Sequence, residues 1–110
     1  MAGSDRRQRP RYALSLRVTI HPAGGGQSVV GVSQDISARG IFVATEALLA
    51  EGQRVELLIH TEEVGLLVMQ GNVVHALPQV GVGVEFLPPN PRTQSRLEAL
   101  LEQAKKSQAS

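Results

Sequence analysis

The chain has 110 residues, 42% of them hydrophobic, which suits one small domain with its own core. It contains no cysteine, which excludes disulfides and thiolate metal sites, and no apolar run near the roughly 20 residues that span a bilayer. The formal net charge is +1, because residues 1–40 hold six arginines against two aspartates (+4), whereas residues 41–110 hold five basic and eight acidic side chains (−3).

The N-terminal third predicts an arm followed by two strands. Residues 1–12 show no hydrophobic periodicity, so we expect a mobile arm rich in arginine. Residues 13–21 alternate apolar and polar side chains, which predicts a half-buried strand. The glycine-rich segment Pro22–Gly26 then predicts a flexible turn. A second strand is expected over roughly 28–34, interrupted by the polar segment Asp35–Gly40.

Four more strands and one helix are expected in the remainder. Each expected strand is rich in β-branched residues or alternates in polarity. The four strands are Ile41–Ala44, Arg54–His60, Gly65–Leu77 and Val80–Phe86. Beyond them, Asn90 is a good N-cap, and leucines recur at helical spacing. We therefore predict an all-β protein with a C-terminal helix, its six strands closed into a small antiparallel barrel.

This pattern divides the chain into three parts of one domain. We expect the mobile arm over residues 1–12, the β-barrel over residues 13–87, and the C-terminal helix and tail over residues 88–110. The positive charge gathers on the arm and its surroundings, which predicts a local anion site rather than a surface that coats nucleic acid.

Two short motifs carry the chemistry. Arg7 and Arg11 lie four residues apart on the arm, with Arg6 just before them. The guanidinium groups suit phosphate and the O6/N7 edge of guanine. The second motif, Asp35–Gly40, holds an aspartate and a serine that can accept the N–H donors of guanine's opposite edge. Each motif taken alone also has a purely structural explanation. The arginines could belong to a solvated tail, and Asp35 and Ser37 could cap a turn.

Together, the motifs resemble the PilZ domain, a bacterial receptor module for cyclic diguanylate. Gly71–Val74 and Gly81–Phe86 also look like later strands of that family. The resemblance implies a six-stranded β-barrel that binds cyclic diguanylate, has no catalytic activity and reports to a partner. The resemblance places the ligand on six residues: Arg6, Arg7, Arg11, Asp35, Ser37 and Gly40. Two secondary candidates come from their chemistry instead: Arg39 suits a phosphate contact, and the ring of His75 suits stacking on a base.

Other site classes lack support in the sequence. His21, His60 and His75 are scattered and no cysteine accompanies them, so we expect no metal and no cofactor beyond the ligand. No serine has partners suited to nucleophilic catalysis, so we expect no enzyme. The arginine-rich start has no apolar stretch behind it and does not read as a secretory signal, which favours a cytoplasmic location.

Three functions stay open at this point. The leading one is a stand-alone PilZ receptor that binds cyclic diguanylate and signals to an unidentified effector protein when its arm becomes ordered. The second is a PilZ-like adaptor that works through protein contacts and binds nucleotide weakly or not at all. The third, nucleic-acid binding through the arm, is disfavoured because only three aromatic residues are available for stacking on bases.

Overall fold

Alternating apolar residues build a sheet, and a helix follows it. The computed structural model describes residues 10–108. Within that range the chain forms seven strands and a helix: β1 (Tyr12–Ala13), β2 (Arg17–Pro22), β3 (Val29–Ile36), β4 (Gly40–Ala44), β5 (Arg54–His60), β6 (Leu66–Leu77), β7 (Gly81–Phe86) and α2 (Pro91–Gln108).

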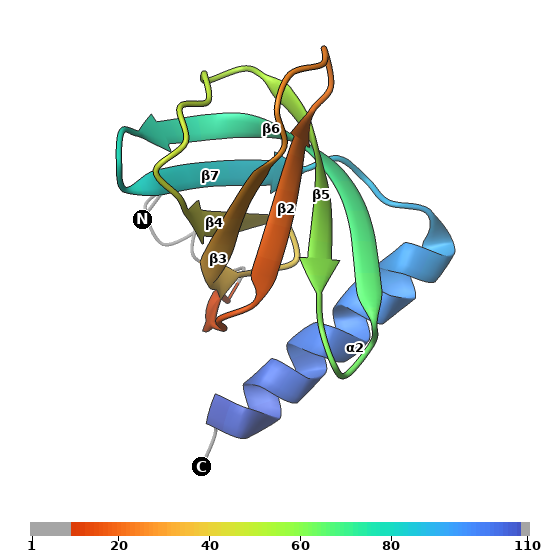
Figure 1. Cartoon of the computed structure of the whole chain (residues 1–110). Helices are drawn as coiled ribbons and strands as arrows, with labels where there is room; N and C mark the ends of the chain where they lie inside the picture. Colours follow the sequence, from red (N-terminus) through yellow and green to blue (C-terminus); the bar gives the residue numbers. More distant parts are fainter. Residues whose placement is uncertain (1–9, 109–110) are drawn as a thin grey trace, which may run out of the picture.

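The strands close into an antiparallel barrel (Figure 1). Their order in the sheet is β1-β3-β2-β5-β6-β7-β4, and β4 also pairs with β3, which joins the two ends. The six strands from β2 to β7 form the barrel, and the two-residue β1 is added beside the end of β3. This arrangement confirms the predicted six-stranded barrel with a C-terminal helix.

Along each strand, every second side chain points into the core. Inward side chains such as Val18, Ile20, Leu57 and Ile59 are fully buried, as their alternation predicts. The helix α2 lies across one end of the barrel (Figure 1) and closes the core with its buried residues, Leu97, Leu100 and Ala104. Burying this stripe holds the helix in place, since most helical stability in proteins comes from packing of the apolar face.

Asn90 begins the helix as its sequence position predicts. Its Oδ1 accepts a hydrogen bond from the backbone N–H of Thr93 at 2.8 Å. Its backbone carbonyl accepts the N–H of Gln94 at 2.8 Å. Pro91 occupies the first helical position, where a missing N–H costs nothing. In the part of the chain that the structure describes, no helix is long and apolar enough to cross a bilayer.

The first predicted strand is split by a serine. Residues 14–16 leave the strand pattern between β1 and β2. The hydroxyl of Ser33, which is buried, donates to the carbonyl of Leu14. The same oxygen accepts the N–H of Leu16 at 2.8 Å. A side chain thus takes the place of the backbone partner here, which the alternation of apolar residues does not reveal.

The second predicted strand is longer than expected. β3 continues through Asp35 and Ile36, which the sequence analysis placed in an interruption, and pairing with β4 shifts register between Ser33 and Asp35. Tyr12, which we placed in the arm, pairs with Ile36 as part of β1. The division into arm, barrel and helix-plus-tail stays a prediction.

Candidate functional site

Pairing of β1 with β3 brings the two motifs together. In this antiparallel pair, Tyr12 lies opposite Ile36 and Ala13 lies opposite Asp35. Arg11, which precedes β1, therefore reaches Asp35 although 24 residues separate them. Both Nε and Nη2 of Arg11 donate to Oδ1 of Asp35, at 2.9 and 2.5 Å.

The Arg11–Asp35 ion pair lies at the surface. The side chains are 51% and 36% exposed, respectively. Water screens such pairs, so this one contributes little to folding. Both described bonds end on Oδ1, so the second carboxylate oxygen can still accept a ligand N–H. The guanidinium has five N–H donors and can bind an anion while it holds the carboxylate.

Ser37 shapes the turn between β3 and β4. Its side chain is buried, with 1% of its surface exposed. Its Oγ accepts the backbone N–H groups of Arg39 at 3.1 Å and of Gly40 at 3.2 Å. Its own N–H donates to the carbonyl of Gly40 at 2.8 Å. These contacts match the turn-capping interpretation of Ser37, and direct contact of this side chain with a ligand stays a prediction.

Gly40 allows β4 to approach β7. A Cβ at this position would lie 2.6 Å from the carbonyl oxygen of Val84, which is closer than real Cβ atoms come. The glycine is thus required by the pairing of the two strands.

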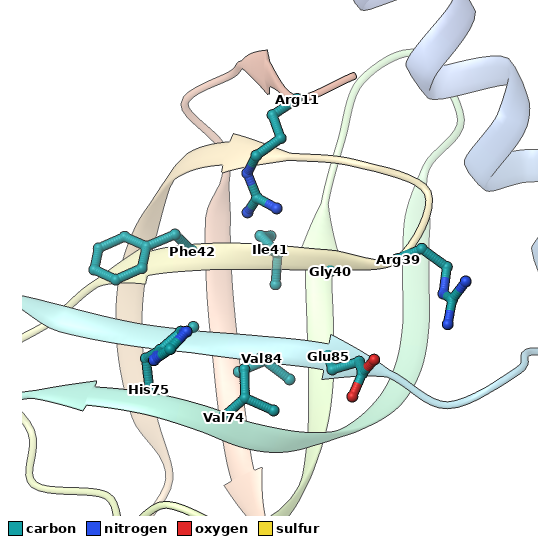
Figure 2. A pocket seen from close by; sticks show the side chains of 10 residues that line it. Arg11, Arg39, Gly40, Ile41, Phe42, Val74, His75, Val84 and Glu85 are labelled. Atoms are coloured by element: carbon teal, nitrogen blue, oxygen red, sulfur yellow. The ribbon is translucent and has the colours of Figure 1, made fainter. Parts of the chain in front are cut away.

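An open groove of about 530 Å³ lies on the outer side of the barrel, over β4, β7 and β6. We call it the outer groove; its volume is within the usual range for small-molecule sites. Figure 2 shows its lining residues: Arg11, Arg39, Gly40, Ile41, Phe42, Val74, His75, Gly83, Val84 and Glu85. Two cationic side chains and one carboxylate are arranged around a mostly apolar floor.

Four of the predicted ligand residues line this groove: Arg11, Arg39, Gly40 and His75. Asp35 is joined to the groove through its ion pair with Arg11. Ser37 lies beneath it, in the turn. Arg6 and Arg7 lie outside the described residues. Within residues 10–108, no cluster of three or more histidine, aspartate or glutamate side chains could hold a metal ion.

Six groove residues were not predicted as ligand contacts: Ile41, Phe42, Val74, Gly83, Val84 and Glu85. Alternation could have found Phe42, since Ile41 and Val43 on either side point into the core. The same argument places Glu85 outward, between the buried Val84 and Phe86.

Two neighbouring residues of β6 reach the groove for a different reason. The pairing of β6 with β7 shifts register between Val73 and His75. At such a bulge the alternation of side chains is broken. Val74 and His75 are consequently both exposed and both line the groove. No sequence pattern announces this irregularity.

Comparison with known proteins agrees with this fold. The sequence model of the family described as "PilZ domain" matches residues 5–103. No curated protein matches the chain significantly. Among solved structures, the PilZ domain of YcgR from Escherichia coli, described with c-di-GMP (cyclic diguanylate), superposes with a TM-score of 0.77 at 14% identity, over 93% of each chain.

Two larger proteins also contain a similar fold. The MrkH–c-di-GMP complex of K. pneumonia has a TM-score of 0.74 at 15% identity, over 94% of this chain and 54% of that one. The Bacillus subtilis inhibitor of motility, MotI/DgrA, has a TM-score of 0.67 at 21% identity, over 94% of this chain and 53% of that one. The present chain thus spans about half the length of either protein. At these identities the likeness establishes the fold alone.

Proposed function

This chain belongs to the PilZ domain family, and from that membership we propose that it is a receptor that binds c-di-GMP in the outer groove. The proposal involves binding and no catalysis. The observation that carries it is the meeting of the two motifs at the rim of the groove, where Arg11 and Asp35 are hydrogen-bonded. An arginine and a carboxylate therefore lie side by side, and these groups suit a phosphate and a guanine edge, respectively.

The chemistry of these groups suits the proposed ligand. Arg11 and Arg39 present two cations to the groove, and c-di-GMP carries two phosphodiesters. The second oxygen of the Asp35 carboxylate makes no hydrogen bond within residues 10–108 and can accept the N1–H or N2–H of a guanine, which adenine does not offer in that position. Arg6 and Arg7 are proposed as further ligand contacts on the basis of their place in the motif. Solved structures of YcgR and MrkH with c-di-GMP support the ligand assignment.

A relay to a partner would run from the groove to helix α2. A second cleft, of about 240 Å³, lies between the arm and this helix and includes Tyr12, Ala38 and Leu101. Arg11 and Arg39 line the outer groove, whereas their chain neighbours Tyr12 and Ala38 line this second cleft. We propose that a ligand held by the two arginines moves these chain neighbours and thereby changes the second cleft.

In this scheme the predicted ordering of the arm applies to the residues before Arg11. Arg11 is already tied to β3 by its ion pair, and Tyr12 by backbone pairing with Ile36. We propose that ligand binding orders the segment that precedes them over the groove. An effector protein would then recognise the combined surface of that segment and α2.

One observation favours the adaptor function instead. The Arg11–Asp35 ion pair links the arm to the barrel by itself, and Ser37 and Gly40 each serve the turn or the strand pairing. The residues of both motifs that the structure describes therefore have structural uses that require no nucleotide.

Isothermal titration calorimetry distinguishes the candidate functions. The receptor proposal expects heat of binding with c-di-GMP at a stoichiometry of one ligand or one stacked pair per chain, and none with a single-stranded oligonucleotide. Absence of binding to both would favour the adaptor. Binding of the oligonucleotide alone would point to nucleic acid and reject the proposal.

A further inference from the structure

The outward side of four neighbouring strands forms an exposed surface that the outer groove does not use. β3, β2, β5 and β6 follow one another in the barrel, and β3, β2 and β5 lie side by side in Figure 1. Of the eight exposed large hydrophobic side chains within residues 10–108, four lie on this surface, which we call the β2–β5 face: Val30, Val32, Leu66 and Val68. A single exposed valine is ordinary in a strand, whereas a contiguous apolar patch marks a contact surface.

Strand register arranges the β2–β5 face in rows that run across the strands. The middle row takes one residue from each strand, in the order Val30, Thr19, Leu58 and Val68. Side chains opposite one another on adjacent strands are about 5 Å apart and touch. The middle row is therefore a continuous and almost wholly apolar ridge, of which only the threonine is polar.

Rows of opposite charge flank this ridge. On one side, Arg17 of β2 lies beside His60 of β5. On the other side, Glu56 of β5 lies beside His21 of β2. Within residues 10–108, neither Arg17 nor Glu56 forms an ion pair. The β2–β5 face thus has a positive side and a negative side, with the apolar ridge between them.

The signs alternate again farther from the ridge. Beyond the row of Arg17, the loop that follows β5 carries Glu62 and Glu63. Beyond the row of Glu56, β5 begins with Arg54, which is exposed. Charges on one side of the ridge therefore have charges of opposite sign in the corresponding places on the other side. In a twofold-symmetric interface the same surface of two copies meets, so this arrangement makes the face complementary to itself.

We infer that the β2–β5 face is the interface of a symmetric dimer of this chain. The twofold axis passes through the middle row, in the plane of contact, so that the apolar ridges of the two copies pack together. Arg17 of each copy then meets Glu56 of the other copy. The face shares no residue with the lining of the outer groove, so the dimer is a property beyond the proposed receptor function and does not rest on it.

The size of the face sets the expected affinity. A standard interface involves about 20–30 residues on each side, and this face offers on the order of ten, which is typical of a weak complex. We expect a dissociation constant on the order of tens of micromolar. Sedimentation equilibrium of the chain without c-di-GMP, from about 5 to 500 μM, should show an apparent mass that rises toward twice that of one chain.

Charge-reversed variants test the pairing of the two copies. Arg17→Glu and Glu56→Arg each bring like charges together in their own homodimers, so each should weaken dimerisation by roughly ten-fold or more. An equimolar mixture of the two variants should associate as well as the wild type does, because every such contact between unlike copies then joins opposite charges. A change confined to one chain would not be repaired by mixing.

Val30→Glu tests the apolar ridge. Val30 is 61% exposed, so the change should leave the melting temperature within a few degrees of wild type while it abolishes association. Val80→Glu is the matched control, because Val80 is 54% exposed and lies between β6 and β7, outside the face. It should dimerise like the wild type.

Three results would overturn the dimer. The first is a wild-type chain that stays monomeric throughout the concentration range, which would leave the face to a different protein. The second is unchanged association in Val30→Glu. The third is failure of the mixed Arg17→Glu and Glu56→Arg chains to associate. None of these results bears on whether the chain binds c-di-GMP, so the receptor proposal is tested separately.

Discussion

Replacing Arg11 by alanine separates ligand binding from folding. The ion pair with Asp35 is 51% exposed on the arginine and 36% exposed on the aspartate. A pair of this exposure contributes about 0.2–1 kcal/mol to stability. Arg11→Ala should therefore lower the melting temperature by at most a few degrees. Binding should suffer far more, since a hydrogen-bonded charged contact contributes about 1.5–3 kcal/mol, or roughly ten-fold to more than a hundred-fold in Kd.

The assay is calorimetric titration with c-di-GMP at fixed salt, with thermal unfolding of the same samples. Arg54→Ala is the matched control, because Arg54 also donates from Nε to a side-chain oxygen, that of Asn72 at 3.0 Å, and does not line the outer groove. Its affinity should equal that of the wild type. An affinity within two-fold of wild type for Arg11→Ala would refute the placement of the site. A large fall in melting temperature would show that Arg11 serves the fold instead.

Asp35→Ala and the double variant extend this test to the pair. Because the two side chains are hydrogen-bonded, their contributions to binding should not add. Since Arg11 is proposed to contact a phosphate and Asp35 a guanine, the double variant should bind more weakly than either single variant, with a combined loss smaller than the sum of the two single losses. A combined loss equal to that sum would show that the ion pair does not couple the two contacts.

Two further outcomes follow from the turn and from the second cleft. Ser37→Ala should lower the free energy of unfolding in urea by about 1–3 kcal/mol, because the N–H groups of Arg39 and Gly40 lose their acceptor. An unchanged urea midpoint would show that the Ser37 hydroxyl does not stabilise the turn. Tyr12 is the only tyrosine in a chain without tryptophan, so its fluorescence reports on the cleft beside Leu101. Addition of c-di-GMP should change the emission of Tyr12 or its quenching by acrylamide. Identical spectra with and without c-di-GMP would contradict the proposed relay from the outer groove to helix α2.

Local sequence patterns predicted the strands and helix well, because burial repeats with a fixed period. Val18 and Ile20 lie inward as alternation requires, and Asn90 caps the helix as its side chain suggests. The break at residues 14–16 escaped prediction because it depends on the hydroxyl of Ser33, which is distant in the sequence. Patterns of local period carry no record of such long-range partners.

The charged residues of the candidate site could be predicted from the sequence, whereas most other residues that line the outer groove could not. The motifs pointed to Arg11 and Asp35, but their direct ion pair depends on the pairing of β1 with β3. The exposure of both Val74 and His75 results from a bulge that the sequence does not announce.

The central claim is that the groove recognises guanine in a cyclic dinucleotide. Its most direct test is calorimetric comparison of c-di-GMP with cyclic diadenylate, which has the same phosphodiester ring and different base edges. We expect c-di-GMP to bind and cyclic diadenylate to bind at least roughly a hundred-fold more weakly, because the acceptor of Asp35 would lose its N–H partner. Equal affinity for the two dinucleotides, or no binding of c-di-GMP, would contradict the claim.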